Sequence, residues 1–192
     1  MAAILKSSQV FGRTILFRNV VSADAQFIYS LRKDSNKSKH ISKSPDDIQN
    51  QIDWINKYER SVDQAYFIIQ EVQSQRCIGT VRLYDPVYTP VSSFCWGSWI
   101  LSSESPSSAA IESALMIYEY GFDYLGFSNS HFDVRKANAS VWKFHENTGA
   151  VRTSETDLDI FYSISAIRQK DFCKRYKRFL PNNIKVIQDY VY

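Results

Sequence analysis

The feature that most constrains the fold is a run of three strand-like segments followed by an amphipathic helix and a fourth strand. The segments 65–72, 76–84 and 93–101 are rich in β-branched and aromatic residues and are separated by short polar turns. Such short connections make neighbouring strands antiparallel. A helix of about residues 106–125 then leads to a strand at 131–134. Two strands joined by a helix in this way have to be parallel. The sequence therefore predicts a sheet that is mostly antiparallel and contains one parallel pair.

The flanking segments complete an α+β fold with helices on both faces of the sheet. The order is strand, two helices, three strands, helix, strand, helix, two strands and a last helix. The flanking elements are expected at 14–21 (strand), 23–33 and 45–58 (helices, the second with Ser44 as its cap), 138–147 (helix), 160–164 (strand) and 166–179 (helix). A chain of 192 residues is long enough to bury a core without metal or disulfide support. We therefore expect one domain over residues 1–192, with a basic helix at its C-terminal end.

Positive charge is concentrated in one part of the chain. Residues 168–178 hold six basic side chains and one acidic side chain, a local charge of +5, whereas the whole chain carries +3. The remainder is therefore about −2, which argues against a general nucleic-acid-binding surface. A solvated helix face explains the basic segment, and a membrane or nucleic-acid contact is the alternative.

Two further features exclude common classes of protein. The apolar run near the start covers only residues 2–5, too short for a signal peptide or a membrane span, so we expect a cytoplasmic protein. The three cysteines, Cys77, Cys95 and Cys173, form no C-x-x-C pair. We therefore expect reduced thiols, with no disulfide framework and no bound metal.

An anion site is expected where the strand at 93–101 passes into the next helix. The start of a helix offers free backbone N–H groups and the positive end of the helix dipole. Ser105 can cap this helix and Pro106 suits its first position, and the residues that follow are small. A loop with a good cap explains the same pattern, and Glu104 would repel an anion if it pointed inward.

The segment 134–150 resembles the late motif of GNAT-superfamily N-acetyltransferases. In that motif an Asn opens a helix, a Tyr commonly follows seven residues on, and a Gly ends the helix eleven residues on. Asn138, His145 and Gly149 occupy these offsets. The segment 97–101 resembles the family's fourth strand, and Arg18 with the helix after it resembles the opening of the family's fold. The resemblance covers about residues 14–165. Two departures are that His145 replaces the Tyr and that Pro106 and Ser108 stand where glycines are usual.

The resemblance implies an enzyme that uses acetyl-CoA as a co-substrate, with its pantetheine arm between two splayed parallel strands. The residues implied in binding it are Trp99, Ile100, Leu101, Ser105, Ser107, Ser108, Ala109 and Asn138. His145 is the implied catalytic acid, since an imidazole with an ordinary pKa of about 6.5 can protonate the departing thiolate near neutral pH. Glu71, Asp133 or water could take the proton from the amine. Trp96 and Trp99 are three residues apart, so they should face opposite sides of a regular strand.

The acceptor is expected to be a small molecule with a primary amine. In this family the loop between the first two helices usually selects the acceptor, and here residues 34–43 are rich in lysine. Such charge suits a phosphate-bearing acceptor, and the late motif is similar to that of acetyltransferases acting on amino sugars for surface polysaccharides. We therefore expect a nucleotide-linked amino sugar, contacted by Arg32, His40 and Tyr84. Acetylation of a protein N-terminus and a non-catalytic GNAT domain are the alternatives, and a homodimer is left open.

Overall fold

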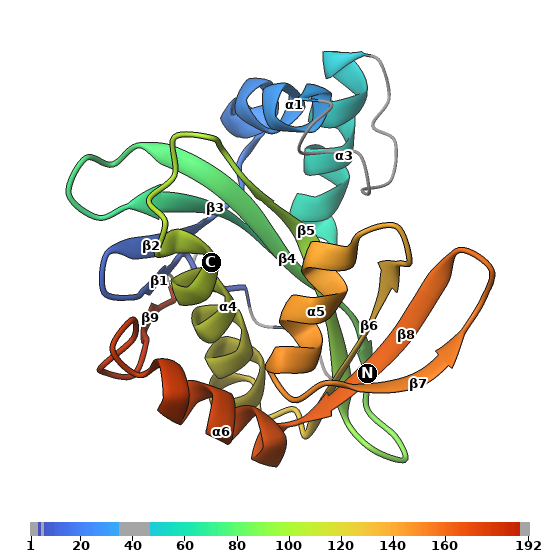
Figure 1. The fold of residues 1–192 in the computed structure, drawn as a ribbon. Helices are drawn as coiled ribbons and strands as arrows, with labels where there is room; N and C mark the ends of the chain where they lie inside the picture. The colour runs from blue at the N-terminus through green and yellow to red at the C-terminus, as the bar shows by residue number, and fades with distance from the viewer. Residues whose placement is uncertain (1–3, 5, 35–46, 189–192) are drawn as a thin grey trace.

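The computed structural model describes residues 4, 6–34 and 47–188, and within them nine strands form one sheet (Figure 1). The strands in chain order are β1 (Gln9–Phe11), β2 (Ile15–Asn19), β3 (Ala65–Glu71), β4 (Cys77–Val87), β5 (Ser93–Leu101), β6 (Asn129–Arg135), β7 (Val151–Glu155), β8 (Asp159–Ser165) and β9 (Lys185–Ile187). Their order across the sheet is β7-β8-β6-β5-β4-β3-β2-β1-β9. Only the pair β5–β6 is parallel. The predicted α+β class is confirmed, as are the antiparallel β3–β4–β5 meander and the parallel pair.

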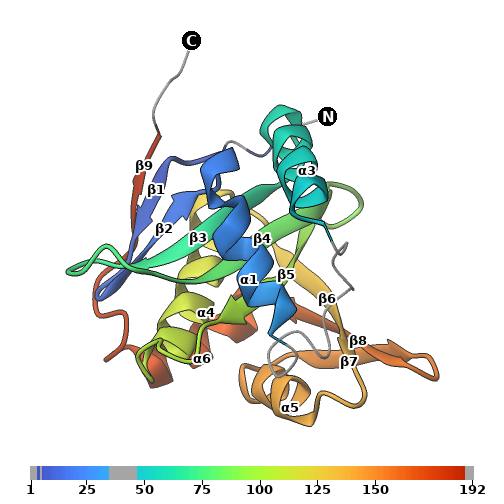
Figure 2. The same cartoon turned by 90° about the horizontal axis from the view of Figure 1, so that it is seen from above.

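Helices cover both faces of this sheet. They are η1 (Ser22–Asp24), α1 (Ala25–Lys33), α3 (Ile48–Arg60), α4 (Ala109–Glu119) with its π-helical extension η2 (Tyr120–Tyr124), α5 (Ala139–Asn147) and α6 (Ala166–Tyr176). Figure 2 shows α1 and α3 over one face, with α4 and α6 behind the sheet. Ile28 and Ile55 pack with Tyr58 on Tyr66 and Ile68 of β3. The larger part of the core lies between the sheet and α4.

Two buried carboxylates fix the connections around the first strands. Asp24 accepts two hydrogen bonds from the Arg18 guanidinium, at 2.6 and 3.0 Å, and one from the amide of Val21 at 2.8 Å. Glu112 of α4 is 1% exposed and accepts from the amides of Arg13 and Thr14 in the β1–β2 turn. The Asp24 contacts fix the end of β2 to the start of α1, and the Glu112 contacts hold the β1–β2 turn to α4.

The helix after β5 begins later than the sequence predicts. It was expected near Pro106 with Ser105 as its cap, but α4 begins at Ala109. The hydroxyl of Ser105 donates instead to the carbonyl of Ser102 at 2.8 Å, and the Ser108 side chain makes no capping hydrogen bond. The strands β1 and β9 were not predicted, because three residues are too few to show an alternating pattern.

The structure also bears on the expectations about membrane-spanning helices, metal sites and cysteines. No helix in the described part of the chain is long and apolar enough to cross a membrane. Among the same residues no group of three or more His, Cys, Asp or Glu side chains is arranged to hold a metal ion. The thiols of Cys77, Cys95 and Cys173 are all free.

Candidate active site

The strands β5 and β6 separate soon after they begin, which opens a wedge in the sheet. They pair only through Ser93 with Asn129 and Phe94 with Ser130. Beyond these two pairs β5 runs on toward α4, while β6 runs on toward α5 (Figure 1). Beyond them, the backbone groups that face the wedge have no sheet partner among the described residues, as the predicted splayed pair requires.

A β-bulge in β5 lies beside the wedge. Arg82 of β4 pairs with Gly97 and Thr80 pairs with Ile100, so β5 has one residue more than β4 over this interval. Ser98 adopts φ +47° there, and its carbonyl accepts from the Thr80 hydroxyl at 2.7 Å. This left-handed conformation is uncommon for a residue with a side chain.

The bulge corrects the expectation for the two tryptophans of β5. Trp96 and Trp99 lie on the same face of the sheet, with ring centroids 5.3 Å apart, because the extra residue converts an odd spacing into an even one. Trp99 donates from Nε1 to the Ser113 hydroxyl of α4 at 3.0 Å and contacts the Phe144 ring of α5. Both indoles therefore line the α4/α5 side of the wedge.

His145 lies in the same aromatic cluster. Its ring centroid is 5.3 Å from that of Trp96 and 4.2 Å from that of Phe132. It is 5% exposed, its Nδ1 has no hydrogen-bond partner among the described residues, and burial lowers its pKa from 6.5 to about 3. The ordinary pKa expected from the sequence is therefore wrong, and the imidazole is neutral near pH 7.

The loop before α4 keeps free backbone donors. The amides of Ser107, Ser108, Ala110 and Ile111 donate to no other group in the described parts of the chain, whereas the amide of Ala109 donates to Pro106 at 2.9 Å. The side chain of Glu104 does not compete for this place. It is 74% exposed and pairs with Arg76 at 2.9 Å. The geometry fits an anion such as the diphosphate of coenzyme A, although the usual glycines are missing.

Asn138 begins α5 as predicted, but its side chain does not cap the helix. Its backbone carbonyl accepts from Val141 and Trp142 at 3.1 and 3.2 Å, and its side-chain oxygen accepts from the Ser140 hydroxyl. Ile100 and Leu101 lie at the end of β5, next to the loop with the free amides. The predicted coenzyme residues thus lie at the end of β5, on the loop before α4 and at the start of α5.

The opposite face of the wedge carries different chemistry. Arg82 of β4 lies over the ring of Tyr84 at 4.1 Å and over that of Trp54 at 5.3 Å. Its Nη1 donates to Gln64 at 3.3 Å, its Nε is buried without a partner, and no carboxylate pairs with it in the described ranges. Gly97 gives the Tyr84 ring room, because a Cβ there would lie 3.2 Å from the Tyr84 hydroxyl. The sequence reasoning named Tyr84 and missed Arg82.

Arg32 joins this face from the end of α1. Burial raises the pKa of the Tyr66 hydroxyl, while Arg32 and Arg82 nearby oppose this shift. Both guanidiniums therefore lie near one tyrosine, on the side of the sheet that α1 and α3 cover. The third predicted acceptor residue, His40, lies outside the described residues.

Three polar side chains at the apex of the wedge were also missed. Ser93 contacts His131 through Oγ and Nδ1 at 2.6 Å, and His131 contacts Asp85 through Nε2 and Oδ2 at 3.2 Å. Only the parallel register of β5 and β6 brings Ser93 and His131 together, and a sequence pattern does not give that register. Of the predicted bases, Asp133 lies on β6 near Cys95, whereas Glu71 is held by Arg76 at the β3–β4 turn.

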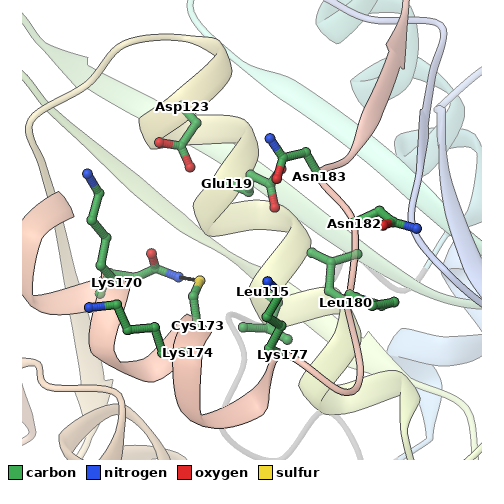
Figure 3. Close-up of a pocket in the computed structure, with 12 residues that line it drawn as sticks. Leu115, Glu119, Asp123, Lys170, Cys173, Lys174, Lys177, Leu180, Asn182 and Asn183 are labelled. Atoms are coloured by element: carbon green, nitrogen blue, oxygen red, sulfur yellow. Dashed lines mark hydrogen bonds between the residues drawn. The ribbon is translucent and has the colours of Figure 1, made fainter.

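A separate cavity of about 260 Å³ lies between α4, α6 and the segment before β9 (Figure 3). It holds none of the predicted site residues. Glu119 accepts there from the amide of Ile184 at 2.8 Å, and burial raises the pKa of the Cys173 thiol to about 11. Phe172 is buried while Lys170 and Lys174 of α6 are exposed, as expected for a helix with one solvated face.

Comparisons with known proteins agree with this geometry. Residues 14–151 match the family model described as an acetyltransferase (GNAT) domain. Among solved structures, apo FdhC, described as a nucleotide-linked sugar GNAT, is 44% identical with a TM-score of 0.79, over 92% of this chain and 97% of that chain. A spermidine N-acetyltransferase from Vibrio cholerae in complex with CoA and spermine is 18% identical, with a TM-score of 0.72 over 82% and 98% of the two chains. The search of curated proteins found no match.

The family match covers well over half of the chain and agrees with the wedge, the bulge and the free amides before α4. The spermidine acetyltransferase, at 18% identity, supports the fold alone. The chain therefore belongs to the GNAT acetyltransferase family and is an N-acetyltransferase.

Proposed function

We propose that this enzyme transfers an acetyl group from acetyl-CoA to the primary amine of a nucleotide-linked amino sugar, by direct attack within a ternary complex. The acceptor class is inferred from the environment of Arg82. Its guanidinium packs against the rings of Tyr84 and Trp54 and has no carboxylate partner among the described residues. A planar guanidinium suits the diphosphate of a nucleotide, and Tyr84 and Trp54 suit a sugar or a base. The 44% identity to a nucleotide-linked sugar GNAT supports the same class.

The α4/α5 side of the wedge is proposed to hold the acetyl donor. The free amides of Ser107, Ser108, Ala110 and Ile111 would bind its diphosphate, with Ser105 and Ala109 completing the loop. Trp99, Ile100 and Leu101 would line the pantetheine arm, and Asn138 would contact it from the start of α5. A backbone N–H at the β5 bulge would stabilise the negative charge that grows on the thioester oxygen. One such donor contributes about 10²- to 10³-fold in rate.

His145 is proposed to position the sulfur of the leaving group. Because burial lowers its pKa to about 3, it carries no proton to deliver as an imidazolium at neutral pH. Its neutral ring can still donate one N–H hydrogen bond to the departing sulfur. The low exposure around Trp96 and Phe132 keeps water away from that bond.

The test is release of coenzyme A thiol with acceptors that share one amine. An amino sugar linked to a nucleoside diphosphate should give a kcat/KM about 100-fold above that of the same amino sugar without the nucleotide. The free sugar lacks the diphosphate and so loses its charge-assisted hydrogen bonds to Arg82. Equal values would remove Arg82 from acceptor recognition. A preference for a peptide with a free N-terminus would replace the proposal with the protein N-terminal acetyltransferase.

A further inference from the structure

Side chains from three strands meet at the apex of the wedge, on the face that α1 and α3 cover. Asp85 comes from β4, Ser93 from β5 and His131 from β6. Ser93 and Phe94 are the two residues of β5 that pair with β6. The Ser93–His131 contact therefore lies where the two strands begin to separate. His131 follows directly after this point on β6.

The neighbours of His131 fix its tautomer. A carboxylate only accepts hydrogen bonds, so Asp85 at 3.2 Å places the ring proton on Nε2. Nδ1 is then the unprotonated nitrogen, and it accepts from the Ser93 hydroxyl at 2.6 Å. The unprotonated Nδ1 of His131 therefore lies next to the Ser93 hydroxyl, and the Asp85 carboxylate stabilises the imidazolium that forms when Nδ1 takes up a proton.

The backbone of β4 is bent to make this contact. Asp85 adopts φ +52°, and the register between β4 and β5 shifts between Tyr84 and Val87. A left-handed residue in an irregular strand is a strained feature of the kind that gathers at functional sites. The side chains of His131 and Asp85 are 34% and 69% exposed, so a proton taken up there can leave to solvent.

We propose that Ser93, His131 and Asp85 form the proton relay that takes the proton from the acceptor ammonium before it attacks. The inference rests on the proposed acetyl transfer and adds its missing base. Ser93 accepts the ammonium proton through a short chain of water molecules, because the β5 bulge lies five residues further along the strand, and passes its own hydroxyl proton to Nδ1 of His131. Asp85 stabilises the charged ring.

The other titratable groups around His131 are less suited to this task. Burial raises the pKa of Cys95 on β5 to about 12 and raises that of Tyr84 on β4. Both groups therefore stay protonated near pH 7. Asp133 lies two residues along β6 on the same face, and β8 places Ser163 opposite His131. A carboxylate is ordinarily a much weaker base than an imidazole.

The step balances without a further reagent. His131 gains the ammonium proton, and the neutral amine forms a C–N bond to the thioester carbon. The C–S bond then breaks, and the second amine proton goes to the thiolate to give the free thiol. His131 returns its proton to solvent, so one proton is released for each amide formed.

The test compares pH profiles of kcat for His131→Gln, Ser93→Ala and Asp85→Asn. With the acceptor that the wild type uses best, His131→Gln should lower kcat at pH 7 by about 100-fold and remove the acidic limb of the profile. Asp85→Asn should lower kcat by a smaller factor, because the imidazolium that forms during the transfer loses its partner charge. Ser93→Ala should lower kcat while its matched control, Ser92→Ala, does not. A wild-type rate and profile in His131→Gln would overturn the relay, and the same losses in Asp133→Asn alone would assign the base to Asp133.

A second readout does not depend on the acceptor. In ¹⁵N NMR spectra of the wild type, the neutral His131 ring should carry its proton on Nε2, and this preference for one tautomer should weaken in Asp85→Asn. Its signals are identified by their loss in His131→Gln. A proton on Nδ1 in the wild type, or a tautomer preference that Asp85→Asn leaves unchanged, overturns the relay. If the enzyme acetylates another amine and no amino sugar, the proposed acceptor class is wrong. The relay is then tested with the amine that is acetylated.

Discussion

The two faces of the wedge each carry one histidine, and the two environments are opposites. His145 is 5% exposed among aromatic rings, with no hydrogen bond to Nδ1 in the described residues. The His131 side chain is 34% exposed and bonded through both ring nitrogens. Burial holds His145 neutral, whereas the His131 ring contacts the Asp85 carboxylate. The wedge therefore separates an apolar side, which suits the thioester, from a polar side, which suits an ionic acceptor and the movement of its proton.

This division differs from the expectation that one histidine does the acid work. Spacing within a motif indicated a position for His145, and the structure places its ring beside Trp96 and Phe132. Its charge depends on burial among Trp96, Phe132 and Phe144, which come from three different elements. The position of a residue can thus follow from local spacing while its protonation state does not.

The largest expected effect comes from removing the cation of the polar face. Arg82→Met should raise the KM for a nucleotide-linked acceptor by about 100-fold, because hydrogen bonds to a charged group contribute about 1.5–3 kcal/mol. Acetyl-CoA affinity, measured by calorimetry, should not change. Arg82→Lys is the matched control and should recover only part of the loss, since lysine cannot form a bidentate contact. A weaker affinity for acetyl-CoA in Arg82→Met would contradict the separation of the two faces.

The second test addresses the loop before α4. Ser108→Glu places a carboxylate beside the free amides and should weaken acetyl-CoA binding by about 30-fold through repulsion of the diphosphate. The same change should not lower the melting temperature, because a negative charge stabilises the start of a helix. Ser108→Gly keeps the amide without the charge and should bind acetyl-CoA almost normally. A simultaneous loss of melting temperature and affinity in Ser108→Glu would indicate damage to the loop instead.

Much of the fold could be predicted because its elements have local signals. The three strands at 65–101 alternate or run apolar between polar turns, and the helix of α4 follows from its apolar stripe. The parallel pair follows from the length of the connection between β5 and β6. The strands β1 and β9 could not be predicted, because three residues are too few to show an alternating pattern and β9 depends on pairing with β1 at the other end of the chain.

The site was less predictable because it depends on register. The bulge at Ser98 exists only as a mismatch between β4 and β5, and it decides the side on which Trp99 lies. Arg82 and Tyr84 share a face by ordinary alternation, so Arg82 could have been inferred once Tyr84 was chosen. Ser93 and His131 are 38 residues apart in sequence, and only the pairing of two strands brings them together.

The third test uses the pH dependence of stability. Burial lowers the pKa of His145 from 6.5 to about 3, so the unfolded chain binds its proton first as the solution becomes acidic. The contribution of the neutral ring is fully present above pH 6.5 and decreases as the pH falls toward 3. The decrease is at most about 1.4 kcal/mol per pH unit. His145→Gln should remove that part of the slope in urea denaturation between pH 6.5 and 4.5. The matched variant His131→Gln should keep that slope. If His131→Gln lost the slope and His145→Gln kept it, His131 and not His145 would be the buried neutral histidine.

The smallest expected effect concerns the hydrogen bond from the Trp99 indole to Ser113, which holds Trp99 on the α4/α5 face of the sheet. Ser113→Ala removes the partner of the Trp99 indole N–H and should lower the free energy of unfolding by about 1 kcal/mol. Trp99→Phe removes the donor but keeps a ring against Phe144. If the bond orients Trp99, the double variant should lose less than the sum of the two single losses, by about 0.5–1 kcal/mol. Additive losses in urea denaturation would mean that the bulge alone holds Trp99 on this face. In that case Ser113→Ala should also leave acetyl-CoA affinity unchanged, whereas an orienting bond predicts a measurable weakening.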